Sequence, residues 1–122
     1  MEITLGPENF RIEGYELYVD TTRVYPGATV EVDPATTHSI RVRYQVRNDG
    51  ATTFHWWECC VTIWDVTHAK AIGSRNDHAQ GWLSTWKDQT ISVGKIAEPT
   101  AFRVKIWANQ DYGAAAPPTG SW

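Results

Sequence analysis

Strict alternation of apolar and polar side chains over residues 39–47 is the feature that most constrains the fold of this chain. The segment reads Ser-Ile-Arg-Val-Arg-Tyr-Gln-Val-Arg, and its apolar positions are Ile40, Val42, Tyr44 and Val46. Successive side chains point to opposite faces of a β-strand, so the pattern predicts a strand with one buried face and one face in water. Asn, Asp and Gly at residues 48–50 predict a turn after it, because these residue types tolerate positive φ.

Two further segments have the same periodicity. Residues 54–65 and 101–108 also alternate, and their expected core positions are Trp57, Cys59, Val61, Ile63, Phe102, Val104, Ile106 and Ala108. Weaker strand patterns cover residues 15–19, 28–33, 69–73 and 88–94. A Pro-Gly pair at residues 26–27 predicts the turn between the first two of these weaker strands.

The balance of residue types points to the same fold class. Ile and Val total 18 residues and Thr 14, whereas the chain has three leucines and one methionine. β-Branched side chains suit a pleated, half-buried surface, and Leu and Met are what helices usually supply. Short strands separated by turns, with no convincing helix, therefore predict an all-β fold, an antiparallel β-sandwich of about seven strands.

Two segments do not fit the strand pattern. Residues 73–87 are expected to form a long connection, in which Trp82 and Trp86 lie four residues apart and allow one helical turn. Residues 109–122 are rich in Ala, Pro and Gly and are expected to form a flexible tail. We therefore expect a single domain over residues 1–108, followed by this tail.

Three short motifs carry a resemblance to a known family. They are Tyr-Pro-Gly-Ala-Thr-Val-Glu-Val at residues 25–32, Ile-Arg-Val-Arg-Tyr-Gln-Val-Arg-Asn-Asp-Gly at residues 40–50, and Val-Thr-Ile-Trp-Asp at residues 61–65. Over residues 24–108 the chain resembles the immunoglobulin-like domains of prokaryotic surface proteins, most of all the cell-adhesion-related type. Residues 33–38 interrupt a strand that is continuous in that family, and the family's last strand has no counterpart after residue 108. The resemblance implies an immunoglobulin-like β-sandwich that serves adhesion, spacing or display.

Seven tryptophans in 122 residues are the second unusual feature. On the strand from residue 56 to residue 64, the face opposite the core carries Trp56, Glu58, Cys60, Thr62 and Trp64. If residues 101–108 pair beside this strand, Arg103, Lys105 and Trp107 join the same face. Trp and Arg dominate interaction hot spots, and indoles also stack on sugar rings. We therefore predict a binding patch of Trp56, Glu58, Trp64, Arg103, Lys105 and Trp107. The alternative is that residues 73–87 fold over this face and form a second small core.

Other chemistries find little support in the sequence. The net charge is −3, and residues 39–122 carry only two more basic than acidic side chains, so nucleic-acid binding is not expected. The four histidines lack the convergent partners of a zinc site, so we expect no metal and no cofactor. Glu58 and Asp65 have opposite parity on one strand and cannot flank a single bond, and no nucleophile has a suitable base. We therefore expect no enzymatic activity.

The only two cysteines, Cys59 and Cys60, are adjacent. Neighbouring side chains on a strand point to opposite faces, so a disulfide between them would need a strained ring, and we expect two free thiols. Cys59 should be buried in the core. Cys60, on the outer face, should react with a thiol reagent in the native protein.

The absence of a further strand leaves the strand at residues 101–108 with an edge to cover. Unpaired N–H and C=O groups on such an edge are generally covered in proteins. Residues 2–5, Glu-Ile-Thr-Leu, are strand-like and can cover it within the chain; alternatively, this segment or the tail pairs with a neighbouring copy. We favour pairing between copies, because Trp56, Trp64 and Trp107 lie beside the same edge.

Residues 1–30 contain four glutamates and no apolar run of about seven residues, so we expect no signal peptide. No segment approaches the roughly 20 apolar residues of a membrane span, so we expect no membrane insertion. The expected location is a virion or the cell interior, or the extracellular space if an export signal has been removed. We predict a non-catalytic structural or interaction module, a subunit or accessory protein of a virion or surface appendage, that associates with itself or with a larger protein assembly. The alternative is a carbohydrate-binding module that uses the tryptophan face.

Overall fold

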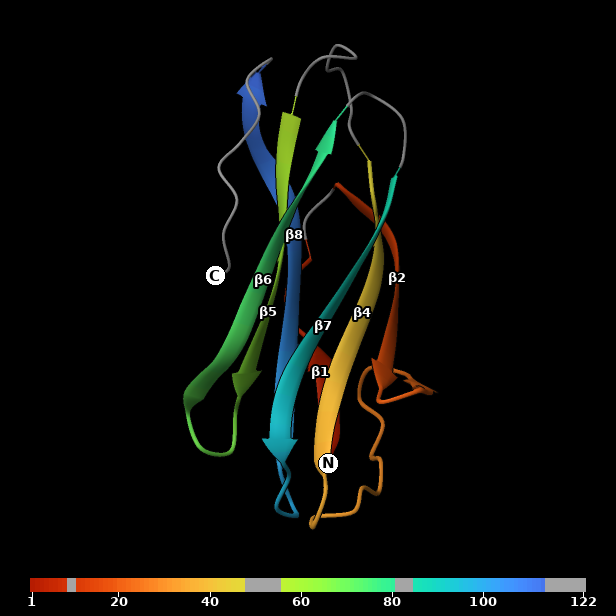
Figure 1. Cartoon of the computed structure of the whole chain (residues 1–122), viewed down its shortest axis with the longest axis vertical. Coiled ribbons are helices and arrows are strands. Elements are labelled where there is room, and N and C mark those ends of the chain that lie inside the picture. Colours follow the sequence, from red (N-terminus) through yellow and green to blue (C-terminus); the bar gives the residue numbers. More distant parts are fainter. Residues whose placement is uncertain (9–10, 48–55, 81–84, 114–122) are drawn as a thin grey trace.

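A computed structural model describes residues 1–8, 11–47, 56–80 and 85–113 (Figure 1). Within these ranges the chain forms eight β-strands and no helix. The strands are β1 (Glu2–Leu5), β2 (Ile12–Val19), β3 (Thr22–Val24), β4 (Thr37–Val46), β5 (Trp56–Asp65), β6 (Lys70–Gln80), β7 (Thr85–Lys95) and β8 (Ala101–Gly113).

The strands form two four-stranded sheets, one in the order β1-β8-β5-β6 and the other in the order β3-β2-β4-β7. All neighbours are antiparallel except β1 and β8, which run parallel. Figure 1 shows the two sheets as two layers with their strands along the long axis, and one hydrophobic cluster draws residues from both sheets. The described chain is therefore all-β, with the two-layer arrangement of a β-sandwich.

The core confirms the strand parity inferred from the sequence. Every core position expected in the three strong strand patterns is buried: Ile40, Val42, Tyr44, Val46, Trp57, Cys59, Val61, Ile63, Phe102, Val104, Ile106 and Ala108. On β4 burial alternates at every residue from His38 to Val46. Trp57 is buried outside the main cluster, where the guanidinium carbon of Arg11 lies 3.7 Å from its ring centroid.

The weaker strand patterns were less reliable. Residues 15–19 and 88–94 lie within β2 and β7, and residues 69–73 overlap the start of β6. Residues 28–33, however, do not form a strand and contribute only an isolated bridge, and the partner of β2 is instead β3. The reason is the tight turn after β2: Val19 pairs with Thr22, which leaves only two turn residues, and Asp20 takes a φ of 54°.

The long connection expected over residues 73–87 is wrong. β6 continues to Gln80 and β7 begins at Thr85, so Trp86 lies on a strand and not in a helical turn. Both strands lie at sheet edges, where a strand has one neighbour and its side chains can stay half-exposed and polar. Lys87 Nζ lies 3.6 Å from Asp77 Oδ2 and links β7 to β6 across the two layers. Trp82 and the turn expected at residues 48–50 lie outside the described residues.

β1 covers part of the edge of β8 from within the same chain. Its register pairs Glu2 with Ala101 and Leu5 with Val104, and the buried side chains of Met1 and Ile3 anchor it in the core. For residues 101–104 the structure therefore has the pairing within the chain, and not the favoured pairing between copies. β8 also runs on through residues 109–113, which the sequence assigned to the tail; residues 114–122 lie outside the described part.

Candidate binding face

Two adjacent strands bring the predicted patch onto one face. β8 pairs with β5 so that Arg103 lies opposite Trp64 and Lys105 opposite Thr62, and Trp107 lies opposite Cys60. The pairing on which the predicted patch depended is therefore present, and the six residues share the outer face of the β1-β8-β5-β6 sheet. We call this outer surface the groove face, after the hollow described below.

One part of the groove face is closed. Glu58 is 3% exposed and Cys60 is 0% exposed, so the expectation that both are accessible from solvent is wrong. β6 lies beside these two side chains, because its register places His78 opposite Glu58 and Asn76 opposite Cys60. Asn76 Nδ2 donates a hydrogen bond to Glu58 Oε1 at 3.2 Å, and burial raises the pKa of the Cys60 thiol. Neither side chain is available to a large ligand from this face.

The three indoles of the predicted patch are half-buried. Trp56 meets His78 edge to face, with ring centroids 6.1 Å apart. The most exposed tryptophan of the described chain is Trp86, on the other sheet, at 45%. The indole of Trp64 lines a hollow in the surface.

This hollow is a groove of about 330 Å³ on the groove face. It is lined by Pro7, Thr62, Trp64, Arg103 and Lys105. A Cβ atom at the preceding Gly6 would lie 3.2 Å from both Arg103 Cγ and the Val104 carbonyl oxygen, so glycine allows the chain to pass close to β8 and bring Pro7 to the rim. Thr62 was expected on this face but was not included in the predicted patch. Pro7 was not predicted, although the Gly-Pro pair directly after the strand-like residues 2–5 was a signal for it.

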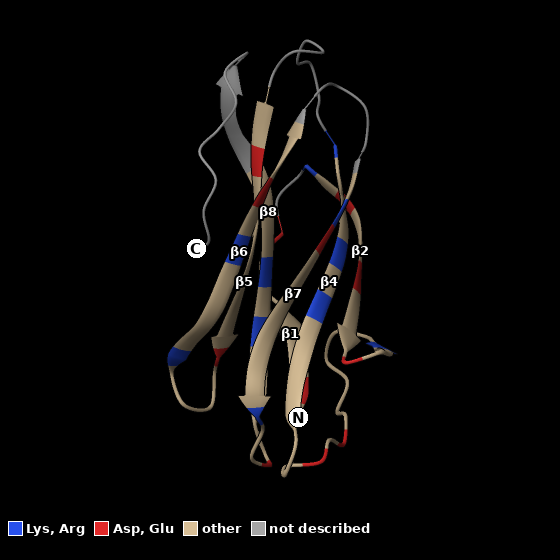
Figure 2. Ribbon diagram, in the orientation of Figure 1, with Lys and Arg blue, Asp and Glu red and all other residues tan. Residues whose placement is uncertain are grey.

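The two cations of the groove, Arg103 and Lys105, are exposed to solvent. Among the residues that the structure describes, neither Arg103 nor Lys105 forms an ion pair or a side-chain hydrogen bond. Figure 2 shows basic positions along β8 and acidic positions in the loops at the lower end of the molecule. The groove therefore combines an indole surface with two uncompensated positive charges, which suits a ligand with carboxylates and an apolar or ring-shaped part.

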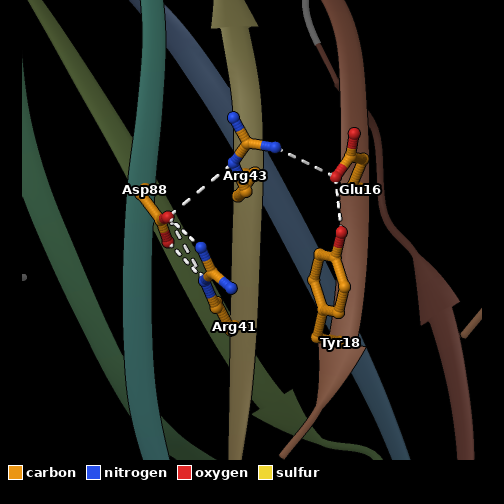
Figure 3. A network of polar contacts seen from close by, with 5 residues as sticks. All are labelled: Glu16, Tyr18, Arg41, Arg43 and Asp88. Carbon is orange, nitrogen blue, oxygen red and sulfur yellow. Dashed lines mark hydrogen bonds and ion pairs between the residues drawn. The ribbon is translucent and has the colours of Figure 1, made fainter. Parts of the chain in front are cut away.

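On the other sheet, Arg41 and Arg43 are paired with carboxylates of the same sheet, as Figure 3 shows. Arg41 makes a bidentate ion pair with Asp88, and Arg43 Nη1 lies 3.3 Å from Glu16 Oε2. Tyr18 donates a hydrogen bond to the same glutamate at 2.6 Å, and this bond is the main cause that lowers the pKa of Glu16. The hydrogen bond from Arg41 likewise lowers the pKa of Asp88. Arg41 and Arg43 thus each have a carboxylate beside them.

The remaining polar clusters have structural roles. Asp65 accepts hydrogen bonds from the backbone N–H of His68 at 2.9 Å and contacts its Nδ1 at 2.8 Å, which closes the turn between β5 and β6. Buried His38 contacts the Asp20 carboxylate through Nδ1 and the Asp33 carbonyl oxygen through Nε2, both at 2.7 Å. No group of three or more His, Cys, Asp or Glu side chains within the described ranges is placed to hold a metal ion.

Comparisons with protein-family models, with curated proteins and with solved structures found no match. Among the described residues there is no helix long and apolar enough to cross a membrane.

Proposed function

We propose that this protein is a non-catalytic interaction module, a subunit or accessory protein of an assembled particle or filament such as a virion or a surface appendage. It binds its protein partner through the groove face. The observation that carries the proposal is the contrast between the two sheets. Arg41 and Arg43 are compensated by carboxylates of the same chain, whereas Arg103 and Lys105 flank an indole and have no such partner among the described residues. An exposed cation pair beside Trp is typical of a contact site for a partner with negative charge.

The charge distribution along the chain favours other copies as partners. Residues 1–38 carry two basic and seven acidic side chains, and residues 39–122 carry nine basic and seven acidic ones, which gives −5 and +2. The acidic part of one copy is thus complementary to the groove face of another. Electrostatic complementarity of this kind fixes orientation and increases the association rate.

The strand order supports an immunoglobulin-like assignment of the sandwich. β2, β4 and β7 follow one another in the order of the A, B and E strands, and β8, β5 and β6 in the order F, C and C′. In this assignment β1, which runs parallel to β8, occupies the place of the last strand. We infer an immunoglobulin-like module with a substituted last strand, which fits a role in adhesion, spacing or display.

The proposal is tested by light scattering coupled to size-exclusion chromatography over a range of protein and salt concentrations. We expect wild-type protein to form oligomers that dissociate as salt screens the charges. The double variant R103E/K105E should be monomeric. The matched control is K70E/K95E, which makes the same change in net charge at exposed lysines away from the groove. A wild-type protein that stays monomeric, or equal behaviour of the two variants, would contradict the proposal.

Carbohydrate binding is the second candidate, because the Trp64 indole lines a groove of the size of a sugar ring and its substituents. Retardation of a monomeric wild-type protein on polysaccharide affinity gels would favour it. In that case Trp64→Ala should abolish the retardation, whereas Trp86→Ala, which removes the exposed indole of the other sheet, should leave it unchanged.

A further inference from the structure

β8 extends beyond β1, and within the described residues its edge on the β1 side has no partner strand from residue 105 onward. The last backbone hydrogen bond between the two segments runs from Gly6 N to Val104 O, and the next residue, Pro7, has no N–H to continue the ladder. From residue 105 to Gly113, the only strand that pairs with β8 in the described part of the chain is β5. The open stretch of β8 begins beside the groove, which Lys105 and Pro7 line.

The open edge sets requirements for a strand that adds to it. The carbonyl of Val104 points to the β1 side, so the backbone groups of Ile106, two residues on, point the same way. Lys105 projects its side chain outward, and Ile106 projects inward at 0% exposure. An added strand therefore needs carboxylates on its outer face and apolar side chains on its inner face.

Residues 29–33 meet both requirements. They read Thr-Val-Glu-Val-Asp, with Glu31 and Asp33 exposed and with Val30 and Val32 packed against the core. Val30 N donates to Met1 O at 2.7 Å, and Val30 O accepts from Met1 N at 2.5 Å. The backbone groups of the alternate residue Glu31 therefore point away from β1. This is the segment for which the sequence predicts a strand and where the structure forms only an isolated bridge.

We propose that residues 29–33 of one copy add as a strand to residues 105–113 of the next copy. The inference rests on the proposed function and names the segment that meets the groove face. Glu31 and Asp33 then lie beside the cations Arg103 and Lys105 on the outer side, and the two valines extend the apolar inner layer. Main-chain hydrogen bonds supply affinity, and the alternating side chains supply specificity. Donor and acceptor are different surfaces, so the contact is head-to-tail and joins the copies into a ring or an open chain.

A charge exchange tests which segment binds the groove face. In light scattering, E31K/D33K and R103E/K105E should each lower the association constant by roughly tenfold or more. An equimolar mixture of the two variants should recover association with the two variants alternating, because each variant keeps one wild-type surface and the two reversed surfaces complement each other. Circular dichroism and urea unfolding of each variant show that it is folded.

A backbone substitution tests strand addition separately from charge. Thr29→Pro removes a backbone N–H that, like that of Glu31, points away from β1, and it leaves the charges unchanged. Thr29→Ala is its matched control. We expect Thr29→Pro alone to weaken association, because proline cannot donate to a new ladder.

The outcomes separate this inference from the proposed function. If R103E/K105E loses association while E31K/D33K and Thr29→Pro associate normally, the groove face remains the contact surface. Strand addition by residues 29–33 would then be overturned. Charge exchange that restores association while Thr29→Pro associates normally would also overturn strand addition. A wild-type protein that is monomeric at every concentration would overturn the proposed self-assembly and this inference with it.

Discussion

Truncation of a buried side chain on β8 provides the most direct test of the fold. The perturbation is Ile106→Ala, and its matched control is Lys105→Ala at the preceding position of the same strand. Ile106 is 0% exposed and belongs to the main hydrophobic cluster, whereas Lys105 is exposed on the groove face. If the parity of β8 is correct, the two substitutions must have very different effects on the free energy of unfolding.

The magnitude follows from the atoms removed. Ile106→Ala removes roughly three methylene equivalents, and at about 0.8 kcal/mol each the lost transfer free energy is roughly 2.4 kcal/mol. The vacated space is at most about 80 Å³, which at about 24 cal/mol per Å³ adds up to roughly 2 kcal/mol if nothing collapses into it. β5 and the opposing sheet restrain such collapse. We therefore expect a loss of about 2.5–4 kcal/mol for Ile106→Ala and about 0.5 kcal/mol or less for Lys105→Ala.

Equilibrium urea unfolding, followed by tryptophan fluorescence, measures both values. A denaturant slope of about 1–3 kcal/mol per M converts the expected loss into a midpoint shift of roughly 0.8–4 M for Ile106→Ala. A shift of less than about 0.3 M for this variant, or a larger shift for Lys105→Ala, would refute the assignment of the buried face.

Three further predictions concern individual side chains. Thiol reagents should label neither Cys59 nor Cys60 in the native protein and both in urea, because burial raises the pKa of Cys59 to about 11 and also raises that of Cys60; one rapid adduct by intact mass would contradict this. The pKa of His38 is raised, mainly by its hydrogen bond to the Asp33 carbonyl. Its contribution to stability should thus be complete below about pH 6.5 and be lost as the pH rises through the raised pKa; urea unfolding should show this decline in wild type and not in His38→Asn. Asp88→Asn should cost less than about 1 kcal/mol, since the side chain is 43% exposed, and a loss well above this in urea unfolding would show that its network is more than a screened surface pair.

The strongly periodic strands could be predicted from the sequence almost completely. β4 and the first eight residues of β8 have the buried faces that alternation predicts, because side-chain direction on a strand repeats every two residues whatever lies next to it. The pairing of β8 with β5 was the condition for the predicted patch, and the register of Arg103 opposite Trp64 meets it.

The edge strands could not be predicted in the same way. β6 has few apolar positions, and the part of it between Gly73 and Gln80 reads as a polar loop. It forms a strand because β5 supplies a partner along its whole length, from Asp65 opposite Lys70 to Trp56 opposite Gln80. Residues 28–33 show the converse, since one of the weaker strand patterns forms only an isolated bridge where no neighbouring strand pairs with it in full.

The amino-acid sequence by itself determined the fold class and the parity of the main strands of this protein, because both follow from local periodicity and β-branched content. Only the tertiary structure decided which outward-facing residues remain accessible. Glu58 and Cys60 have the same parity as Trp64, yet β6 brings His78 and Asn76 beside them, and they are buried while Trp64 borders a groove. Exposure on the outer face of a sheet depends on side chains contributed by segments far apart in the chain, and no local pattern records that proximity.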